Sequence, residues 1–169
     1  LDEAITIGDR IAIMRDGEII QIGTPKEIIT QPADDFVKEF TQGIPKTKVI
    51  DIEHVVSEPE VVFSPTDSHE LVRAKMDQAN TDYAIGIDLE EQYLGILCRD
   101  QLDAAVDHTI NIDSLVDSSI VSVLPDTTLD EALTFLSDQN LPIPVVDESN
   151  AFIGVATQPD LLKVVASGR

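Results

Sequence analysis

The sequence predicts an α/β (α+β) protein in which one β-α-β-β-α unit occurs twice. Residues 120–165 read as strand, Pro-Asp-Thr-Thr turn, helix, strand, Asp turn, strand and helix, and residues 61–106 repeat that order. Equivalent positions lie 60 residues apart in the pairs Pro65 and Pro125 and Asp100 and Asp160, and 59 apart in Gly95 and Gly154. One residue is therefore missing just after the glycine of the first copy. Two such small units commonly bury their sheets against each other, because neither has enough core alone.

The second copy carries clear signals for its elements. Thr128 is expected to cap a helix, and Glu131 is expected to complete a capping box. The helical period turns four apolar residues toward a core, namely Leu129, Ala132, Leu133 and Leu136. Apolar strands are predicted at residues 143–146 and 152–155, on either side of a turn at Asp147.

A β-hairpin and two short helices are predicted before the repeat. Residues 11–14 and 19–22 form apolar strands, joined by a turn that contains Asp16 and Gly17. The first helix begins with a cap, an N-terminal proline, a capping-box glutamate and two apolar residues: Thr24, Pro25, Glu27, Ile28 and Ile29. Pro32 ends it, and residues 34–40 follow as a second amphipathic helix with three residues inward: Phe36, Val37 and Phe40.

Composition and charge exclude several classes of protein. Apolar content of 43% and charged content of 25% are ordinary for a folded chain, but the net charge is −21. Such an acidic chain is repelled by phosphate backbones and anionic lipid surfaces, so no nucleic-acid partner is expected. The single Cys98 excludes an intrachain disulfide and fits a reducing compartment. No apolar run approaches the ~20 residues of a spanning helix, and the missing initiator Met indicates a piece of a longer protein.

The repeat resembles the tandem cystathionine-β-synthase (CBS) domain pair over about residues 55–166. The resemblance rests on a glycine-apolar-x-Thr/Ser-x-x-Asp motif, which falls on Gly154, Val155, Thr157 and Asp160. In that family the ligands are usually adenine nucleotides or related compounds, held in the cleft between paired units. The resemblance therefore implies a regulatory module.

The implied nucleotide cleft has a chemical rationale. The carboxylate of Asp160 can bond two ribose hydroxyls, while Thr157 and free amides at the helix start can meet a phosphate. Apolar backbone would flank the base. The implied binding residues are Ile120, Val121, Pro144, Val155, Thr157 and Asp160. The alternative is that Thr157 and Asp160 simply cap the last helix, since Thr-x-x-Asp is a common helix start.

The first copy departs from this motif. Cys98 stands where a hydroxyl is expected, so no second standard nucleotide site is predicted there. We interpret Cys98 as a packed small hydrophobic residue. Arg99 is interpreted as an exposed side chain, with a phosphate contact across the interface as the alternative.

Residues 2–4, 8–14 and 17–28 resemble the end of an ABC-transporter ATPase domain. In that family the switch histidine lies just upstream of a Leu-Asp-Glu-Ala segment, so here it would precede Leu1. The resemblance implies that this histidine, the phosphate-binding loop, the magnesium-binding carboxylate and the signature motif lie outside the chain. We therefore expect no ATP hydrolysis by the fragment, no catalytic residues and no required cofactor.

An ATPase tail joined to a CBS pair resembles the ATP-binding subunit of glycine betaine/carnitine/choline (or betaine/proline) osmoprotectant importers. The implied segments are 1–42, the end of the ATPase domain; 43–54, a linker; 55–115, a degenerate first CBS unit; and 116–166, the second CBS unit. Residues 50–56 fit either a strand or a helix. The family implies a bacterial or archaeal subunit on the cytoplasmic side of the cell membrane, bound to a membrane permease, whose full-length parent hydrolyses ATP with magnesium.

Two functions from different classes remain open. The leading hypothesis is a regulatory module that senses an adenine nucleotide, with cyclic di-AMP favoured, or ionic strength, and gates transport. The alternative is a ligand-free module that forms a homodimer and holds two ATPase subunits together. The three histidines are widely spaced and expected at the surface, so no metal site is predicted: His54, His69 and His108. The sequence names neither the regulatory ligand nor the transported solute.

Overall fold

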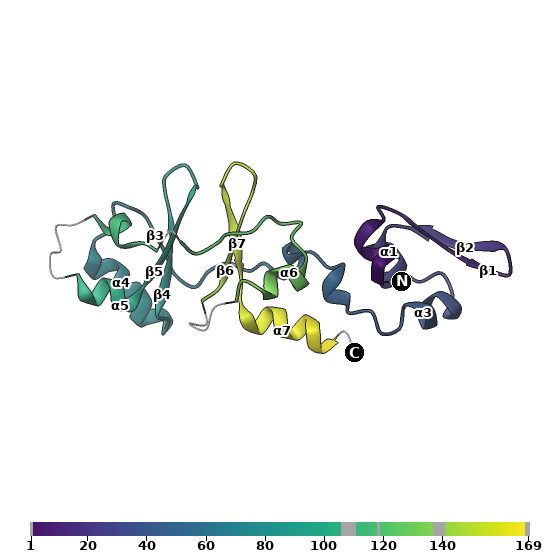
Figure 1. Ribbon diagram of the computed structural model, residues 1–169. Coiled ribbons are helices and arrows are strands. Elements are labelled where there is room, and N and C mark those ends of the chain that lie inside the picture. The colour runs from purple at the N-terminus through teal and green to yellow at the C-terminus, as the bar shows by residue number, and fades with distance from the viewer. Residues whose placement is uncertain (1, 106–110, 118, 137–140, 168–169) are drawn as a thin grey trace.

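The computed structural model describes residues 2–105, 111–117, 119–136 and 141–167. Figure 1 shows two small α/β units side by side, with the N-terminal hairpin and helices at one end of the molecule. We call residues 2–42 the N-terminal module, residues 61–104 the first unit and residues 123–167 the second unit. This arrangement confirms the predicted fold class. In the described part of the chain, no helix is both long and apolar enough to cross a membrane.

The N-terminal module has the predicted hairpin and helices. It consists of α1 (Asp2–Ile7), β1 (Ile11–Arg15), β2 (Glu18–Gly23), α2 (Pro25–Thr30) and α3 (Asp35–Thr41). Asp16 and Gly17 both have positive φ, which is the geometry that a tight hairpin turn requires. The core contains Ile11, Ile13, Ile28 and Val37. The inward prediction for Phe40 is wrong: the side chain is 52% exposed and stacks on Phe36, with ring centroids 6.0 Å apart.

The connection between the N-terminal module and the repeat is ordered into two 3-10 helices, η1 (Lys46–Lys48) and η2 (Ile52–Val55). Thr47 and Val49 are buried, so this segment packs against the neighbouring elements. The ambiguity over residues 50–56 is resolved as the helix η2, with an isolated bridge from Asp51 to Thr128.

The first unit contains β3 (Val62–Phe63), α4 (His69–Ala79), β4 (Tyr83–Ile87), β5 (Tyr93–Cys98) and α5 (Arg99–Ala104). The strand order is β3-β4-β5, with β3 parallel to β4 and β4 antiparallel to β5. This is the predicted β-α-β-β-α order. The end of the predicted repeat, residue 106, lies outside the described residues, which resume with the 3-10 helix η3 (Ile112–Leu115).

The second unit repeats this topology with a shorter leading strand. It contains α6 (Leu129–Leu133), β6 (Ile143–Val146), β7 (Phe152–Ala156) and α7 (Gln158–Ser167). The strand expected near residue 120 is reduced to one parallel bridge between Val123 and Val145. The capping box of Thr128 and Glu131 is confirmed, and the predicted apolar face of α6 packs into a core.

Each unit is completed by the segment that precedes the other one. Ser57, which leads into the first unit, exchanges backbone hydrogen bonds of 2.9 and 3.0 Å with Val155 in β7. Asp117, which leads into the second unit, pairs in the same way with Ile96 in β5. The cores follow this exchange: Ile52 is fully buried in the core of the second unit, and Ile112 is buried in that of the first. We call residues 50–57 and 112–117 the crossing segments.

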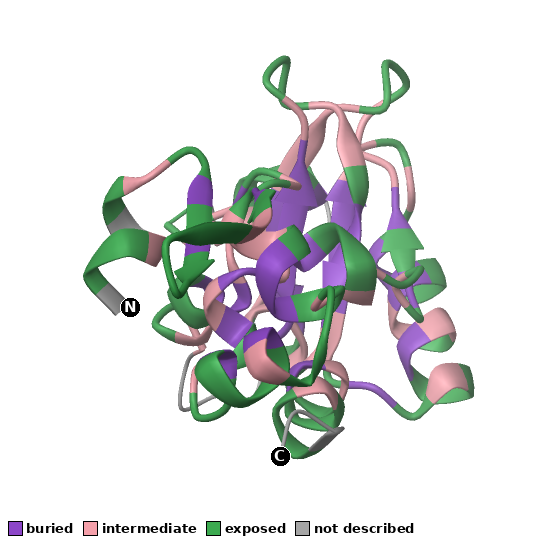
Figure 2. Cartoon of the chain, turned by 90° about the vertical axis from the view of Figure 1, so that its right-hand side faces the viewer, coloured by how far each residue is buried: buried purple, intermediate pink, exposed green. Residues whose placement is uncertain are grey.

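The two sheets pack against each other through a third apolar cluster. Its buried members are Ile85, Ile96 and Val155. The hairpin tips also pair: Tyr93 stacks on Phe152 with ring centroids 6.1 Å apart, and the Phe152 N–H donates to the Glu91 carbonyl over 2.8 Å. Figure 2 shows the buried residues concentrated in these central strands, and Figure 1 shows the two hairpin loops next to each other.

Candidate functional site

A pocket of about 330 Å³ lies where the second crossing segment meets the second unit. Its lining residues are Asp117, Ser119, Ile120, Val121, Phe135, Leu141, Pro142 and Ile143. The volume is at the lower end of the ~300–1,000 Å³ typical of small-molecule sites. The lining is mostly apolar, with one aromatic ring and one carboxylate. Such a lining suits an apolar ring system that carries a few polar groups.

The polar end of the pocket is formed by Asp117 and Ser119. The carboxylate Oδ1 of Asp117 accepts hydrogen bonds from the Ser119 N–H at 2.9 Å and from its hydroxyl at 2.5 Å. These bonds lower the pKa of Asp117 below its ordinary value, so the carboxylate is ionised at neutral pH. Its charge also contributes to the raised pKa of Tyr93 and of Cys98, for which burial is the larger cause.

The structure brings two of the six predicted site residues into this pocket. Ile120 and Val121 both line it. Pro144 is buried behind the lining, and its carbonyl accepts from the Val123 N–H over 2.9 Å. Val155 is 1% exposed between the two sheets, and both of its backbone polar groups are taken by the first crossing segment. Val155 therefore supports the site from behind rather than from within.

Thr157 and Asp160 form a hydrogen-bonded turn beside the pocket. The Thr157 hydroxyl donates to Asp160 Oδ2 over 2.5 Å, and the Asp160 N–H donates back to that hydroxyl over 3.3 Å. Lys163 Nζ lies 3.1 Å from Asp160 Oδ1. Ile143 pairs with Ala156 in the sheet, so the chain continues directly from the pocket wall into Thr157. The pair caps α7 in this structure, and ribose binding would exchange that bond for ligand hydroxyls.

Removal of the Thr157 hydroxyl is expected to raise the pKa of Asp160. That pKa lies below its ordinary value, chiefly because of the Thr157 hydrogen bond and then because of Lys163. A depressed carboxyl pKa adds stability above about pH 4, and this stability is lost as the pH falls through the folded-state value. Thr157→Val should move the Asp160 pKa toward normal and make the protein less resistant to acid.

An NMR titration of the Asp160 carboxyl measures this effect directly. Lys163→Met serves as the matched variant, because it removes the second partner that lowers the Asp160 pKa and leaves the Thr157 hydrogen bond in place. If the Asp160 pKa were the same in Thr157→Val and the wild type, the hydroxyl would not be what stabilises the charged carboxylate.

The first unit carries different side chains at the equivalent positions, Cys98 and Arg99. Cys98 packs with the apolar cluster between the sheets, its N–H donates to Gln101 Oε1 over 2.8 Å at the start of α5, and burial raises the pKa of its thiol. Arg99 is not the exposed side chain that we expected: it pairs with Asp77 at 2.7 Å and Asp82 at 2.9 Å, and it also donates to the Thr81 carbonyl. Its guanidinium is thus directed into its own unit rather than toward a phosphate across the interface.

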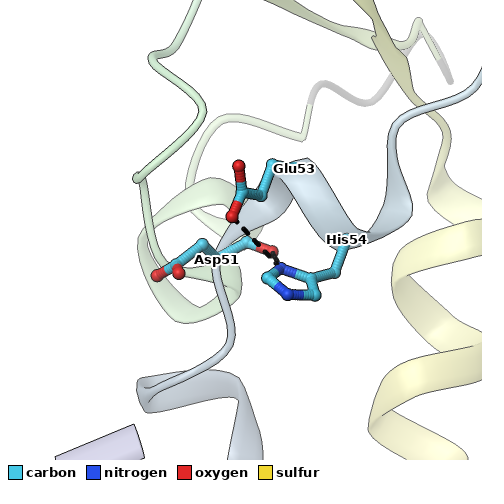
Figure 3. A group of neighbouring side chains, drawn as sticks. All are labelled: Asp51, Glu53 and His54. Atoms are coloured by element: carbon cyan, nitrogen blue, oxygen red, sulfur yellow. Dashed lines mark hydrogen bonds and ion pairs between the residues drawn. The ribbon is translucent and has the colours of Figure 1, made fainter. Parts of the chain in front are cut away.

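The histidines are only partly as predicted. His54 is exposed, but His69 is 4% exposed at the start of α4, so its surface prediction is wrong; His108 lies outside the described residues. Asp51, Glu53 and His54 bring potential ligand atoms within 4.8 Å of one another (Figure 3). The Asp51 carboxylate is already paired with Lys26 at 2.7 Å, and His54 lies 3.8 Å from Glu53. This group is accounted for by its ion pairs and carries no argument for a metal site.

Sequence reasoning missed most of the pocket lining. Phe135 follows α6 and is 43% exposed, which is unusual for an aromatic residue, and it was not singled out. Asp117 and Ser119 have the Asp-x-Ser pattern of a local side-chain turn, which was the available signal. Asp117 and Ser119 become part of a pocket only because the folded chain places Leu141 and Pro142 in the same lining.

Two units that exchange their leading segments, with a Gly-x-x-Thr-x-x-Asp turn in the second, have the architecture of a CBS domain pair. Residues 112–167 match the family model of the CBS domain. The pairing of this unit with a second one of the same topology is shown by the fold.

The chain is similar over 98% of its length to the glycine betaine transport ATP-binding protein OpuAA of Bacillus subtilis (30% identity) and to the glycine betaine/proline betaine protein ProV of Salmonella typhimurium (32%). Other relatives are carnitine and choline transport ATP-binding proteins. Its homologues are thus ATP-binding subunits of betaine, carnitine and choline ABC transporters. The chain spans 40% and 42% of the length of the first two relatives.

Solved CBS structures share the fold. CbpB in complex with c-di-AMP matches with a TM-score of 0.63 at 19% identity, covering 70% of this chain and 86% of that one. Staphylococcus aureus OpuCA matches with a TM-score of 0.59 at 19% identity, covering 68% and 97%. At 19% identity these structural matches show that the chain shares the fold of the CBS pair. They do not show which ligand it binds.

Proposed function

We propose that the chain is the regulatory CBS module of the ATPase subunit of a quaternary-amine osmoprotectant importer, and that it senses an adenine nucleotide, with cyclic di-AMP favoured. The observation that carries the proposal is the apolar pocket of about 330 Å³ beside the Thr157–Asp160 turn. The pocket offers the base an apolar slot with one aromatic wall, and the turn offers the ribose a carboxylate. In the first unit Cys98 stands where the second unit has Thr157, and Arg99 is paired with Asp77.

The longer relatives support a proposal for the whole subunit. In it, residues 1–42 are the end of an ATPase domain, residues 43–54 connect it to the CBS pair, and residues 55–115 and 116–166 are the two CBS units. The complete subunit would bind ATP and magnesium, contact a membrane permease at the cytoplasmic side of the membrane and form a homodimer. Cyclic di-AMP fits such a dimer, because a two-fold symmetric ligand can place one base in each of two symmetry-related pockets.

A physical connection runs from the pocket toward the N-terminal module. Phe135 in the pocket wall follows α6, and the first residue of α6, Leu129, donates its N–H to the Ile50 carbonyl over 2.9 Å. The neighbouring Asp51 pairs with Lys26 of α2 at 2.7 Å. A ligand that favours one position of α6 can thereby favour one orientation of the ATPase end. About 1.4 kcal/mol of difference in ligand affinity between two arrangements shifts their ratio tenfold.

Ionic strength is the second candidate signal, and the Lys26–Asp51 pair favours it. The two side chains are 40% and 25% exposed, so dissolved ions can screen their attraction. The net charge of −21 adds a general repulsion that salt also weakens. Between about 0.01 and 0.15 M ionic strength the Debye length falls from ~30 to ~8 Å, which is the range where these effects change most.

Calorimetric titration tests the proposal and separates the candidates. The chain is titrated with cyclic di-AMP, AMP and ATP, each at low and high salt. Saturable binding of cyclic di-AMP near one ligand per dimer is the expected result. Saturable binding of AMP or ATP in its place would make the module a sensor of cellular energy.

Absence of saturable binding by all three nucleotides would overturn nucleotide sensing. The oligomeric state measured across the same salt series then decides what remains. A salt-dependent state would support sensing of ionic strength, and a constant dimer would support the alternative, a ligand-free dimerisation module.

A further inference from the structure

We propose that Asp117 selects the base of the bound nucleotide, by accepting a hydrogen bond from the exocyclic amino group of adenine. This inference rests on the proposed function, because it assumes that the pocket of about 330 Å³ receives the base. It assigns a specificity-determining role to a residue outside the Gly-x-x-Thr-x-x-Asp motif.

Only one of the two carboxylate oxygens of Asp117 accepts a hydrogen bond from the described residues. Both of the hydrogen bonds that it accepts within the described residues, from the Ser119 N–H and hydroxyl, go to Oδ1. Oδ2 is therefore the acceptor that a ligand can use. Among the described residues that line this pocket, Asp117 alone has an ionisable side chain. A base edge that presents N–H donors is favoured there, and one that presents a carbonyl oxygen is repelled.

Asp117 and the Thr157–Asp160 turn are held by different parts of the fold. Asp117 is held toward the first unit, because its N–H donates to the Ile96 carbonyl over 2.9 Å. The Thr157–Asp160 turn belongs to the second unit and follows directly from the strand beside Ile143. In a purine nucleotide the ribose on N9 and the substituent on C6 lie at opposite ends of the ring system. With the ribose at Asp160, the C6 substituent lies at the far end of the base from the turn, and the proposal places Asp117 at that end.

The substitution Asp117→Asn reverses this preference without changing the shape of the site. The amide oxygen of asparagine keeps the two bonds from Ser119, so its NH₂ group takes the place of Oδ2. An acceptor is thus replaced by a donor, which suits the 6-carbonyl of hypoxanthine. The backbone pairing of residue 117 with Ile96 is unaffected by the side chain.

The test compares cyclic di-AMP with cyclic di-IMP, and AMP with IMP, by calorimetry on the wild type, Asp117→Asn and Asp126→Asn. Wild type should prefer the adenine ligand by at least ~10-fold, as expected for a hydrogen bond to a charged group. In Asp117→Asn this preference should fall below ~3-fold or invert, with tighter binding of the hypoxanthine ligand. Asp126 is an exposed carboxylate outside the pocket lining, so Asp126→Asn controls for the change in charge and should retain the preference.

Equal preference in the wild type and Asp117→Asn would overturn the inference and leave the proposed function intact. Wild-type protein that binds adenine and hypoxanthine ligands equally would do the same. If no adenine nucleotide binds to the wild type, the proposed function fails and the inference fails with it. A gain in affinity for cyclic di-IMP or IMP cannot come from an unfolded variant, so the expected result does not depend on a loss of binding.

Discussion

We expect Gly95→Ala to lower the free energy of unfolding by about 3–5 kcal/mol, because strain and overpacking act together at this position. Gly95 has a φ of +137°, which side chains rarely adopt. A Cβ atom there would overlap Val116 Cγ1 and lie 3.0 Å from the Asp117 carbonyl oxygen. Both neighbours belong to the second crossing segment, so the substitution should force that segment away from β5. Urea denaturation measures the loss.

Two other glycines separate the contributions to this effect. Gly17 has a φ of +87°, and a Cβ atom there would meet nothing within 4 Å, so Gly17→Ala adds backbone strain alone and should cost about 1 kcal/mol. Gly154 has no such φ, but a Cβ would overlap Val56 and lie 2.8 Å from the Ser57 carbonyl, so Gly154→Ala adds overpacking alone, about 1–3 kcal/mol. Gly95→Ala that costs no more than Gly17→Ala would contradict the close approach of the crossing segment.

Ile52→Ala is expected to destabilise the protein by about 2–5 kcal/mol, as for other large-to-small changes in a core. Ile52 is fully buried in the core of the second unit, although it precedes the first unit in the chain. Its N–H also donates to the Thr127 carbonyl over 2.8 Å, which holds the first crossing segment against the start of α6. Truncation of this side chain leaves a cavity among buried residues that are 71 or more positions later in the sequence, beginning at Val123.

Ile112→Ala and Ile153→Ala are the matched variants for this prediction. Ile112 is 1% exposed in the core of the first unit, so its truncation should have an effect of similar size. Ile153 lies in β7 but is 48% exposed, and its truncation should cost less than about 1 kcal/mol. Equal and small effects for Ile52 and Ile153 would show that the first crossing segment does not belong to the second core.

Local features of the structure were predictable because their causes are local. The capping boxes of Thr24 and Thr128 depend on residues three positions away, and the hairpin turn depends on Asp16 and Gly17. The strands of the second unit followed from short apolar runs on either side of Asp147. The presence of two equivalent units was also predictable, because comparison of the two halves of the sequence shows the repeat directly.

The candidate site was only half predictable. Thr157 and Asp160 were identified from their motif and form a hydrogen-bonded turn, and Ile120 and Val121 are among the residues that line the pocket. Val155 was placed in the cleft but lies in the core between the sheets, because the crossing segment occupies its exposed edge. Arg99 was interpreted as exposed, and its pairing with Asp77, which lies 22 positions earlier, has no local signature.

The sequence by itself determined the order of elements in the two units, except for the leading strand of the second, together with their caps and turns and the Gly-x-x-Thr-x-x-Asp motif. Only the tertiary structure decided that each crossing segment pairs with the sheet of the other unit. This pairing also determines which residues form the pocket. The bonds responsible join residues as far apart as Ser57 and Val155. No short stretch of sequence specifies such a pairing, because it forms only when both sheets bury their apolar faces against each other and leave one edge of each for the crossing segment. Gly95 and Gly154 lie where the crossing segments contact the strands, and a Cβ atom at either position would overlap the crossing segment.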